Sequence, residues 1–271
     1  MKPQRNRLDL ALVRQGCFSS REQAREAIVA GRVFVNGLPA IKPSRFVSPD
    51  DIIDVRGDVL PYVSRGGLKL IHALKVFGIS LAGLTVLDVG ASTGGFTDCA
   101  LQEGACRVFA IDVGYGQLAW KLRNDPRVTV LERTNIRYLT PEALGEKADF
   151  AVIDVSFISL EKVLPPVGYL LKKDAAGLAL IKPQFEAGPE NVGKKGVVRH
   201  PATHAAVCAK IVRFITAMNW EVRGLTHSPV RGPEGNIEFF VYFSKVPGKP
   251  WRGNIEEIIA LAHELFGNAK R

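Results

Sequence analysis

The segment TVLDVGASTGGF, residues 85–96, predicts a buried strand that runs into a tight turn and then into a helix. Three apolar residues surround Asp88, and glycines follow at positions 90, 94 and 95. Glycines let backbone N–H groups approach a ligand closely, and the N-terminus of a helix favours polar or anionic groups. In an α/β protein, such a turn is where a nucleotide-like cofactor binds.

Strand and helix patterns alternate from this segment towards the end of the chain. Strands are expected at 84–89, 107–111, 128–131, 149–154, 177–182, 221–229 and 237–243, and helices at 95–103, 116–123, 159–172, 203–219 and 253–266. A further helical run at 68–77 precedes them. This alternation predicts a mostly parallel sheet of seven strands with helices on both faces. Only a short turn separates the last two strands, so they are expected to form an antiparallel hairpin, which makes the sheet mixed.

A smaller, basic module precedes this α/β part. Residues 1–47 hold nine Lys/Arg against three acidic residues, which is six of the nine net positive charges of the chain. Such asymmetry indicates a polyanionic partner, nucleic acid before membrane surface. Ser19 and Ser20, followed by Glu22 and Gln23, predict the N-cap of a helix. Arg21, Arg25 and Arg32 are spaced by four and seven, which predicts one helical face, and Asn36-Gly37 predicts a hairpin. We expect the module at 5–58, a linker at 59–66 and the larger domain at 67–271.

Several other classes of protein are disfavoured by composition. The four cysteines form no C-x-x-C pair and none lies near a histidine at zinc-finger spacing, so no metal site is expected. No signal-peptide pattern opens the chain, and no run approaches the ~18 apolar residues that cross a bilayer. We therefore expect a cytoplasmic protein without a membrane segment.

The residues of the glycine turn favour S-adenosylmethionine over a nicotinamide dinucleotide. A dinucleotide site has the pattern G-x-G-x-x-G, whereas here the second glycine is replaced by Ser92. Asp88 suits a positively charged methionine group. Asp112, about 20 residues further on, is expected to bind ribose hydroxyls, with a helix N-cap as the alternative. The expected cofactor-binding residues are Asp88, Gly90, Ala91, Ser92, Thr93, Gly94, Gly95, Phe96, Asp112, Asn135 and Asp154.

Charged residues stand at the ends of three other predicted strands. Asp154 and Lys182 follow apolar runs, and Glu238 begins the last strand. The carboxyl ends of parallel strands converge on the crevice where ligands bind, so these side chains are expected to meet there. Lys69, on the helix before the first strand, is expected to reach the same rim.

Two resemblances follow from these residues. Residues 7–9 (RLD) and 20–37 (SREQAREAIVAGRVFVNG) are similar to the RNA-binding domain of ribosomal protein S4. The set Lys69, Asp154, Lys182 and Glu238 resembles the Lys-Asp-Lys-Glu tetrad of ribose 2′-O-methyltransferases related to FtsJ. Together with residues 62–70 (YVSRGGLKL) and 182–186 (KPQFE), they make the whole chain resemble the TlyA family.

The resemblance implies a class I S-adenosylmethionine-dependent methyltransferase fold behind a small α+β RNA-binding domain. It also implies methylation of a cytidine ribose 2′-hydroxyl in ribosomal RNA, free or in ribosomal subunits, with the tetrad as catalytic residues. The RNA-binding residues are then Arg7, Arg21, Arg25, Arg32 and Arg65. An ordinary lysine is protonated at neutral pH, so Lys182 is either a base or an aligner of the hydroxyl. Two alternatives stand beside the enzyme: a membrane-active haemolysin, and an RNA-binding protein without catalytic activity.

Overall fold

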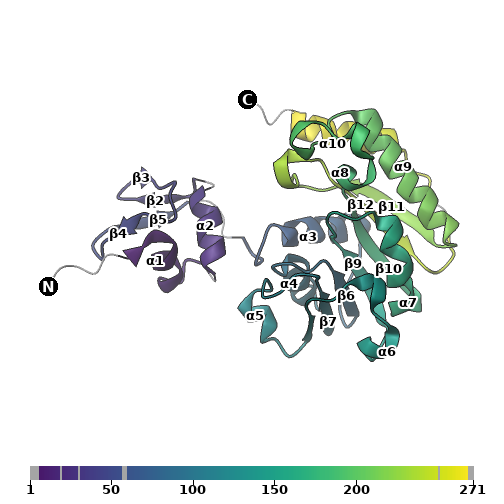
Figure 1. The fold of residues 1–271 in the computed structure, drawn as a ribbon, viewed down its shortest axis with the longest axis horizontal. Coiled ribbons are helices and arrows are strands. Elements are labelled where there is room, and N and C mark those ends of the chain that lie inside the picture. The colour runs from purple at the N-terminus through teal and green to yellow at the C-terminus, as the bar shows by residue number, and fades with distance from the viewer. Residues whose placement is uncertain (1–5, 19, 30, 57–59, 250, 268–271) are drawn as a thin grey trace. The chain divides into compact units, whose positions relative to one another are not determined.

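The computed structural model describes residues 6–18, 20–29, 31–56, 60–249 and 251–267. The chain divides into two compact units, Met1–Ser64 and Arg65–Arg271. In Figure 1 the first unit is purple to dark blue, and the second runs from blue through green to yellow. The division falls within the segment that the sequence predicts to be a linker.

The first unit packs two helices against a small antiparallel sheet. The helices are α1 (Leu8–Arg14) and α2 (Arg21–Val29), and the sheet has the order β3 (Leu38–Pro39), β2 (Val33–Val35), β5 (Ile53–Val55). A separate two-residue pair joins β1 (Asn6–Arg7) to β4 (Phe46–Val47). Leu8 and Leu12 of α1, Ile28 of α2 and Val33 of β2 are fully buried in one apolar core.

Local sequence signals explain the turns of this unit. The Ser20 hydroxyl accepts a hydrogen bond from the backbone N–H of Gln23 at 3.2 Å, which is the predicted N-cap of α2. Ser19, the other predicted cap residue, lies outside the described residues. Asn36 and Gly37 both have left-handed backbone, with φ of 54° and 79°. A two-residue hairpin turn of this type requires positive φ at both positions, so the predicted hairpin is confirmed and joins β2 to β3.

The prediction that Arg32 continues the helical arginine face is wrong. Helix α2 ends at Val29, and Gly31 has left-handed backbone with φ of 70°. A left-handed glycine terminates a helix and turns the chain away from its axis. Arg32 therefore lies between α2 and β2, and only Arg21 and Arg25 share the helix.

The second unit is built on a mixed seven-stranded sheet, as predicted. Its order is β11 (Glu221–His227), β12 (Phe239–Ser244), β10 (Leu171–Ile181), β9 (Ala148–Ile153), β6 (Thr85–Val89), β7 (Arg107–Ile111), β8 (Val128–Leu131). Five strands from β10 to β8 run parallel, whereas β12 is antiparallel to both β10 and β11. The predicted antiparallel hairpin is therefore confirmed, and its second strand is inserted next to β10.

Helices cover both faces of this sheet. The longer ones are α3 (Gly66–Phe77), α4 (Gly95–Gln102), α9 (Pro201–Ala217) and α10 (Ile255–Gly267), and the shorter ones are α5 (Trp120–Arg123), α6 (Pro141–Leu144), α7 (Leu164–Leu170) and α8 (Pro183–Glu186). Residues of α7, α9 and α10 share one core cluster with Leu87 and Val89 of β6. Asp88, between them, points to the other face, where it contacts Thr97 of α4. This alternation follows from the two-residue period of a strand.

The predicted helix over 159–172 is wrong in its extent. A short 3₁₀ turn (Leu160–Lys162) comes first, α7 begins only at Leu164, and β10 already starts at Leu171. Pro165 and Pro166 explain the late start, because proline lacks an N–H and fits only in the first turn of a helix.

Two kinds of feature are absent from the described ranges. None of the helices there has both the length and the apolar character needed to cross a membrane. The same residues contain no group of three or more His, Cys, Asp or Glu side chains placed to hold a metal ion.

Candidate active site

The turn after β6 depends on glycine for two different reasons. Gly90 has φ of 89°, and a Cβ atom at this position would collide with the backbone carbonyl of Asp154 at the end of β9. Gly94 has φ of 94°, but a Cβ there would meet the side chains of Leu118 and Leu122. Gly90 therefore lets two strand ends approach each other, whereas Gly94 lets the turn pack against the α5 region.

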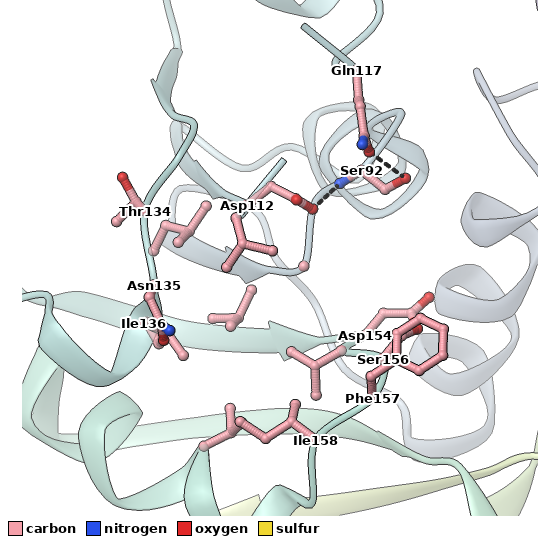
Figure 2. A pocket seen from close by; sticks show the side chains of 16 residues that line it. Ser92, Asp112, Gln117, Thr134, Asn135, Ile136, Asp154, Ser156, Phe157 and Ile158 are labelled. Atoms are coloured by element: carbon pink, nitrogen blue, oxygen red, sulfur yellow. Dashed lines mark hydrogen bonds between the residues drawn. The ribbon is translucent and has the colours of Figure 1, made fainter. Parts of the chain in front are cut away.

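A pocket of about 510 Å³ lies beside this turn, at the carboxyl ends of the parallel strands (Figure 2). Its volume is in the range of small-molecule and cofactor sites. It is lined by five of the predicted cofactor residues: Gly90, Ser92, Asp112, Asn135 and Asp154. Figure 2 shows Asn135 on the left of the pocket and Asp154 on the right, with Asp112 and Ser92 above them in this view.

The remaining predicted turn residues are not among the described residues that line this pocket. They are Ala91, Thr93, Gly94, Gly95 and Phe96. The ring of Phe96 is buried and stacks on that of Phe240, with 6.1 Å between the ring centroids. A large apolar ring at the start of α4 stabilises the fold by burial, so the structure gives Phe96 a packing role.

Asp112 fastens the glycine turn to the segment after β7. Its Oδ2 accepts a hydrogen bond from the backbone N–H of Ser92 at 2.8 Å, and its Oδ1 accepts one from Gly114 at 2.7 Å. The helix that follows begins at Trp120 with Ala119 as its N-cap, so the N-cap alternative for Asp112 is excluded. Each carboxylate oxygen can accept a second hydrogen bond, which leaves Asp112 able to bind a ribose hydroxyl in the pocket.

Asp88 is a buried carboxylate without a cation beside it. Its Oδ2 accepts a hydrogen bond from the Thr97 hydroxyl at 2.6 Å, whereas its Oδ1 has no partner among the described residues. Burial first, and the negative charge of Asp154 to a smaller extent, raise the pKa of Asp88 to about 7. Asp88 lies two residues before Gly90 and does not itself line the pocket.

Buried acceptor atoms such as Asp88 Oδ1 nearly always have a hydrogen-bond donor, so a bound ligand is expected to supply one here. The methionine ammonium group of S-adenosylmethionine is such a donor, and it carries the charge that Asp88 lacks. The residues of this site therefore fit S-adenosylmethionine.

Asn135 and Gln117 form further parts of the pocket wall. Asn135 Oδ1 accepts a hydrogen bond from the backbone N–H of Arg137 at 3.1 Å, which starts a 3₁₀ turn (Ile136–Tyr138). Its contact with an adenine amine stays a prediction. Gln117 was not predicted: its Oε1 accepts from the Ser92 hydroxyl at 3.4 Å. No pattern in the sequence distinguishes this glutamine from an ordinary loop residue.

The four predicted catalytic residues form two ion pairs. Lys182 Nζ lies 2.6 Å from Asp154 Oδ1, and Lys69 Nζ lies 2.6 Å from Glu238 Oε2. Both lysines are buried, and Glu238 is fully buried, whereas Asp154 faces the pocket. The second pair joins residues that are 169 positions apart in the chain.

Two residues that follow Asp154 belong to the site and were not predicted. Lys182 Nζ donates a hydrogen bond to the Ser156 hydroxyl at 2.9 Å. Phe157 is 90% exposed, has left-handed backbone with φ of 62°, and its ring lies 4.9 Å from that of Phe185. A bulky residue with positive φ is rare and strained, and such strain is common at functional sites. Both residues belong to the segment 152–157 (VIDVSF), in which only Asp154 could be predicted from the sequence as a functional residue.

Gly232 makes room for Glu238. A Cβ atom at position 232 would collide with the Glu238 carboxylate. Since Glu238 is fully buried and paired with Lys69, it cannot move aside cheaply. Gly232 thus supports the buried ion pair without contacting the pocket.

The predicted RNA-binding arginines have different surroundings. Arg7 and Arg21 both bind the fully buried carboxylate of Asp9, each with a nitrogen 2.9 Å from Oδ2. These hydrogen bonds, from Arg7 first, lower the pKa of Asp9 to about 2. Arg25 is exposed on α2, and Arg65 is exposed at the N-cap of α3. Arg7 and Arg21 thus have a structural role, and contact of these arginines with RNA stays a prediction.

Comparisons with known proteins agree with this geometry. The FtsJ-like methyltransferase family matches residues 62–245, and the S4 domain matches residues 6–53. A relative from Mycobacterium tuberculosis, the 16S/23S rRNA (cytidine-2′-O)-methyltransferase TlyA, is 50% identical over 239 residues, which cover 88% of this chain and 89% of the relative. The chain belongs to the TlyA family.

Other TlyA-like proteins carry a different name. Hemolysin A of Brachyspira hyodysenteriae is 39% identical over 238 residues, covering 88% of this chain and 99% of that protein. A solved structure from Streptococcus thermophilus, described as a hemolysin, is 41% identical with a TM-score of 0.79 and covers 100% of this chain and 99% of its own. The predicted family and fold class are therefore confirmed, and the second unit is an FtsJ-like methyltransferase.

Proposed function

We propose that this protein transfers a methyl group from S-adenosylmethionine to a ribose 2′-hydroxyl of ribosomal RNA, with cytidine as the nucleotide. The observation that carries the proposal is Lys182 Nζ, held between Asp154 and Ser156 at the rim of the cofactor pocket. The S4 domain supports an RNA substrate, and the name of the M. tuberculosis relative supports cytidine. Ribosomal subunits are then its partners, and the cytoplasm is its place of action.

The chain's own residues are arranged to align a hydroxyl group. S-adenosylmethionine, when bound, supplies a methyl group on a positively charged sulfur. An ammonium group has three N–H donors. The Ser156 hydroxyl accepts one from Lys182, and the Asp154 carboxylate forms an ion pair with it, so a donor remains for the ribose oxygen. Glu238 fixes Lys69, which adds positive charge near the oxygen. This arrangement holds the 2′-oxygen in line with the methyl group.

Substitution of Lys182 tests the proposal. Lys182→Ala should reduce the single-turnover rate of methyl transfer to ribosomal RNA by about 10³-fold, because the oxygen loses its alignment. The affinity for S-adenosylmethionine should change by no more than about twofold, since Lys182 does not line the pocket. Tritiated methyl incorporation measures the rate, and calorimetry measures the affinity. A rate of methyl transfer by Lys182→Ala equal to that of wild type would contradict the proposal.

Lys182→Arg separates the two possible roles of the lysine. Arginine can donate hydrogen bonds but cannot take up a proton at neutral pH. A rate clearly above that of Lys182→Ala supports alignment, and an equal loss supports a base. Wild-type protein that binds the cofactor and RNA without turnover would indicate the inactive alternative, and leakage of lipid-only vesicles would indicate the haemolysin.

A further inference from the structure

Glu186, at the end of α8, is a buried acid that the proposed chemistry does not use. Its side chain is 2% exposed. Oε2 accepts a hydrogen bond from the Ser159 hydroxyl, and Oε1 accepts one from the backbone N–H of Leu160, both at 2.7 Å. Lys210 of α9 lies 3.3 Å from Oε2 and balances the charge.

These hydrogen bonds are the outermost of several links between the same two segments, 154–160 and 182–186. Lys182 contacts Asp154 and Ser156 at one end. The rings of Phe185 and Phe157 meet next, and Glu186 reaches the far end. The two segments therefore run side by side from the catalytic ion pair outward.

Segment 154–160 needs such support. It has no regular secondary structure before the 3₁₀ turn at Leu160, and Phe157 has left-handed backbone. Backbone of this kind persists only where its surroundings hold it. At its C-terminal end the segment is held by the two hydrogen bonds to Glu186, of which the one from Leu160 is buried.

We propose that Glu186 is a positioning residue for methyl transfer, which holds the Asp154 segment against Lys182 through Ser159 and Leu160. The inference rests on the proposed function of the site. The inference attributes the role of Glu186 to its two hydrogen bonds and not to its negative charge. A glutamine can accept from Leu160 and donate to Ser159, because a hydroxyl can also act as acceptor.

Three variants of the full chain test this. Glu186→Ala should reduce the single-turnover rate on ribosomal subunits by about tenfold or more, because small displacements of reacting groups are costly. Glu186→Gln should stay within about threefold of wild type. Glu161→Gln is the matched control, since Glu161 also pairs with Lys210, at 3.1 Å, but its side chain is 35% exposed and leaves the segment untouched. It should have the wild-type rate, and all three should bind S-adenosylmethionine as wild type does.

Hydrogen–deuterium exchange makes the inference independent of turnover. The Leu160 amide should exchange slowly in wild type, Glu186→Gln and Glu161→Gln, and faster in Glu186→Ala. If wild type itself fails to methylate RNA, the proposed function fails, whereas this exchange pattern still tests whether Glu186 holds the segment 154–160.

The inference is overturned if Glu186→Ala keeps the wild-type rate, if Glu186→Gln is as slow as Glu186→Ala, or if the loss lies in cofactor affinity. Should Glu186→Ala not fold, Ser159→Ala removes one of the two hydrogen bonds and should reduce the rate by about threefold. An unchanged rate in that variant would equally overturn the inference.

Discussion

Two aspartates, one in each unit, are both fully buried but have opposite surroundings. Asp9 in the first unit accepts hydrogen bonds from two guanidinium groups, and its pKa is lowered to about 2. Asp88 in the methyltransferase unit accepts hydrogen bonds from Thr97 and has no cationic partner among the described residues, and its pKa is raised to about 7. Asp9 is thus neutralised by its own chain, whereas Asp88 lacks a cation that a ligand can supply.

The difference separates structural from functional burial of charge. An acid whose pKa is lowered by built-in cationic partners stabilises the folded state fully above its ordinary pKa, and this stabilisation is lost as the pH falls through the lowered pKa. A buried acid without such a partner destabilises the folded state once it is ionised. Such unpaired buried acids are found mainly at functional sites, where a ligand can compensate the charge. If the proposed function holds, we expect Asp88 to contribute more to cofactor affinity than the glycines around it.

The largest effect that tests this contrast is expected on cofactor binding. Asp88→Asn should weaken S-adenosylmethionine binding by about 100-fold, or about 2.7 kcal/mol, because a buried charge-assisted hydrogen bond is lost. At pH 8 the same variant should be at least as stable as wild type, since it removes an uncompensated charge. Calorimetry and thermal unfolding measure the two quantities. Unchanged affinity would remove Asp88 from the cofactor site.

Asp9→Asn should have the opposite profile. It should destabilise the first unit by about 2 kcal/mol, because two partly exposed arginines lose their buried partner. Its affinity for S-adenosylmethionine should equal that of wild type. Hydrogen exchange of the α1 and α2 amides in the full chain measures the stability. A variant as stable as wild type would show that the cluster contributes nothing to the fold.

The smallest effect is a pH dependence of cofactor binding. The pKa of Asp88 is raised, so the proton stays bound below about pH 7, and a cationic ligand binds the ionised form. Affinity for S-adenosylmethionine should therefore fall as the pH falls, by about tenfold from pH 8 to pH 6. Asp88→Asn is the control and should show no such dependence. A wild-type affinity that is constant over this range would contradict the raised pKa.

Much of the active site could be predicted because its signals are local. An apolar strand that ends in Asp88 and a glycine turn needs no distant partner to be recognised. Strand ends converge in any doubly wound sheet, which is why Asp154, Lys182 and Glu238 could be assigned to one rim. Ser156 and Glu186 were not assigned a role from the sequence, because a serine or glutamate has no distinguishing pattern until its partner is known.

The sequence by itself determined the order of strands and helices and the glycine turn, because each depends on short-range pattern, and it predicted S-adenosylmethionine and the four residues of the tetrad. Only the tertiary structure decided how the tetrad pairs, with Lys69 on Glu238 and Lys182 on Asp154. It also decided that Arg7 and Arg21 share Asp9, and that β12 lies between β10 and β11. These pairings join residues that are far apart in the sequence. They depend on strand order and on the direction of each side chain, and both are set only when the chain is folded.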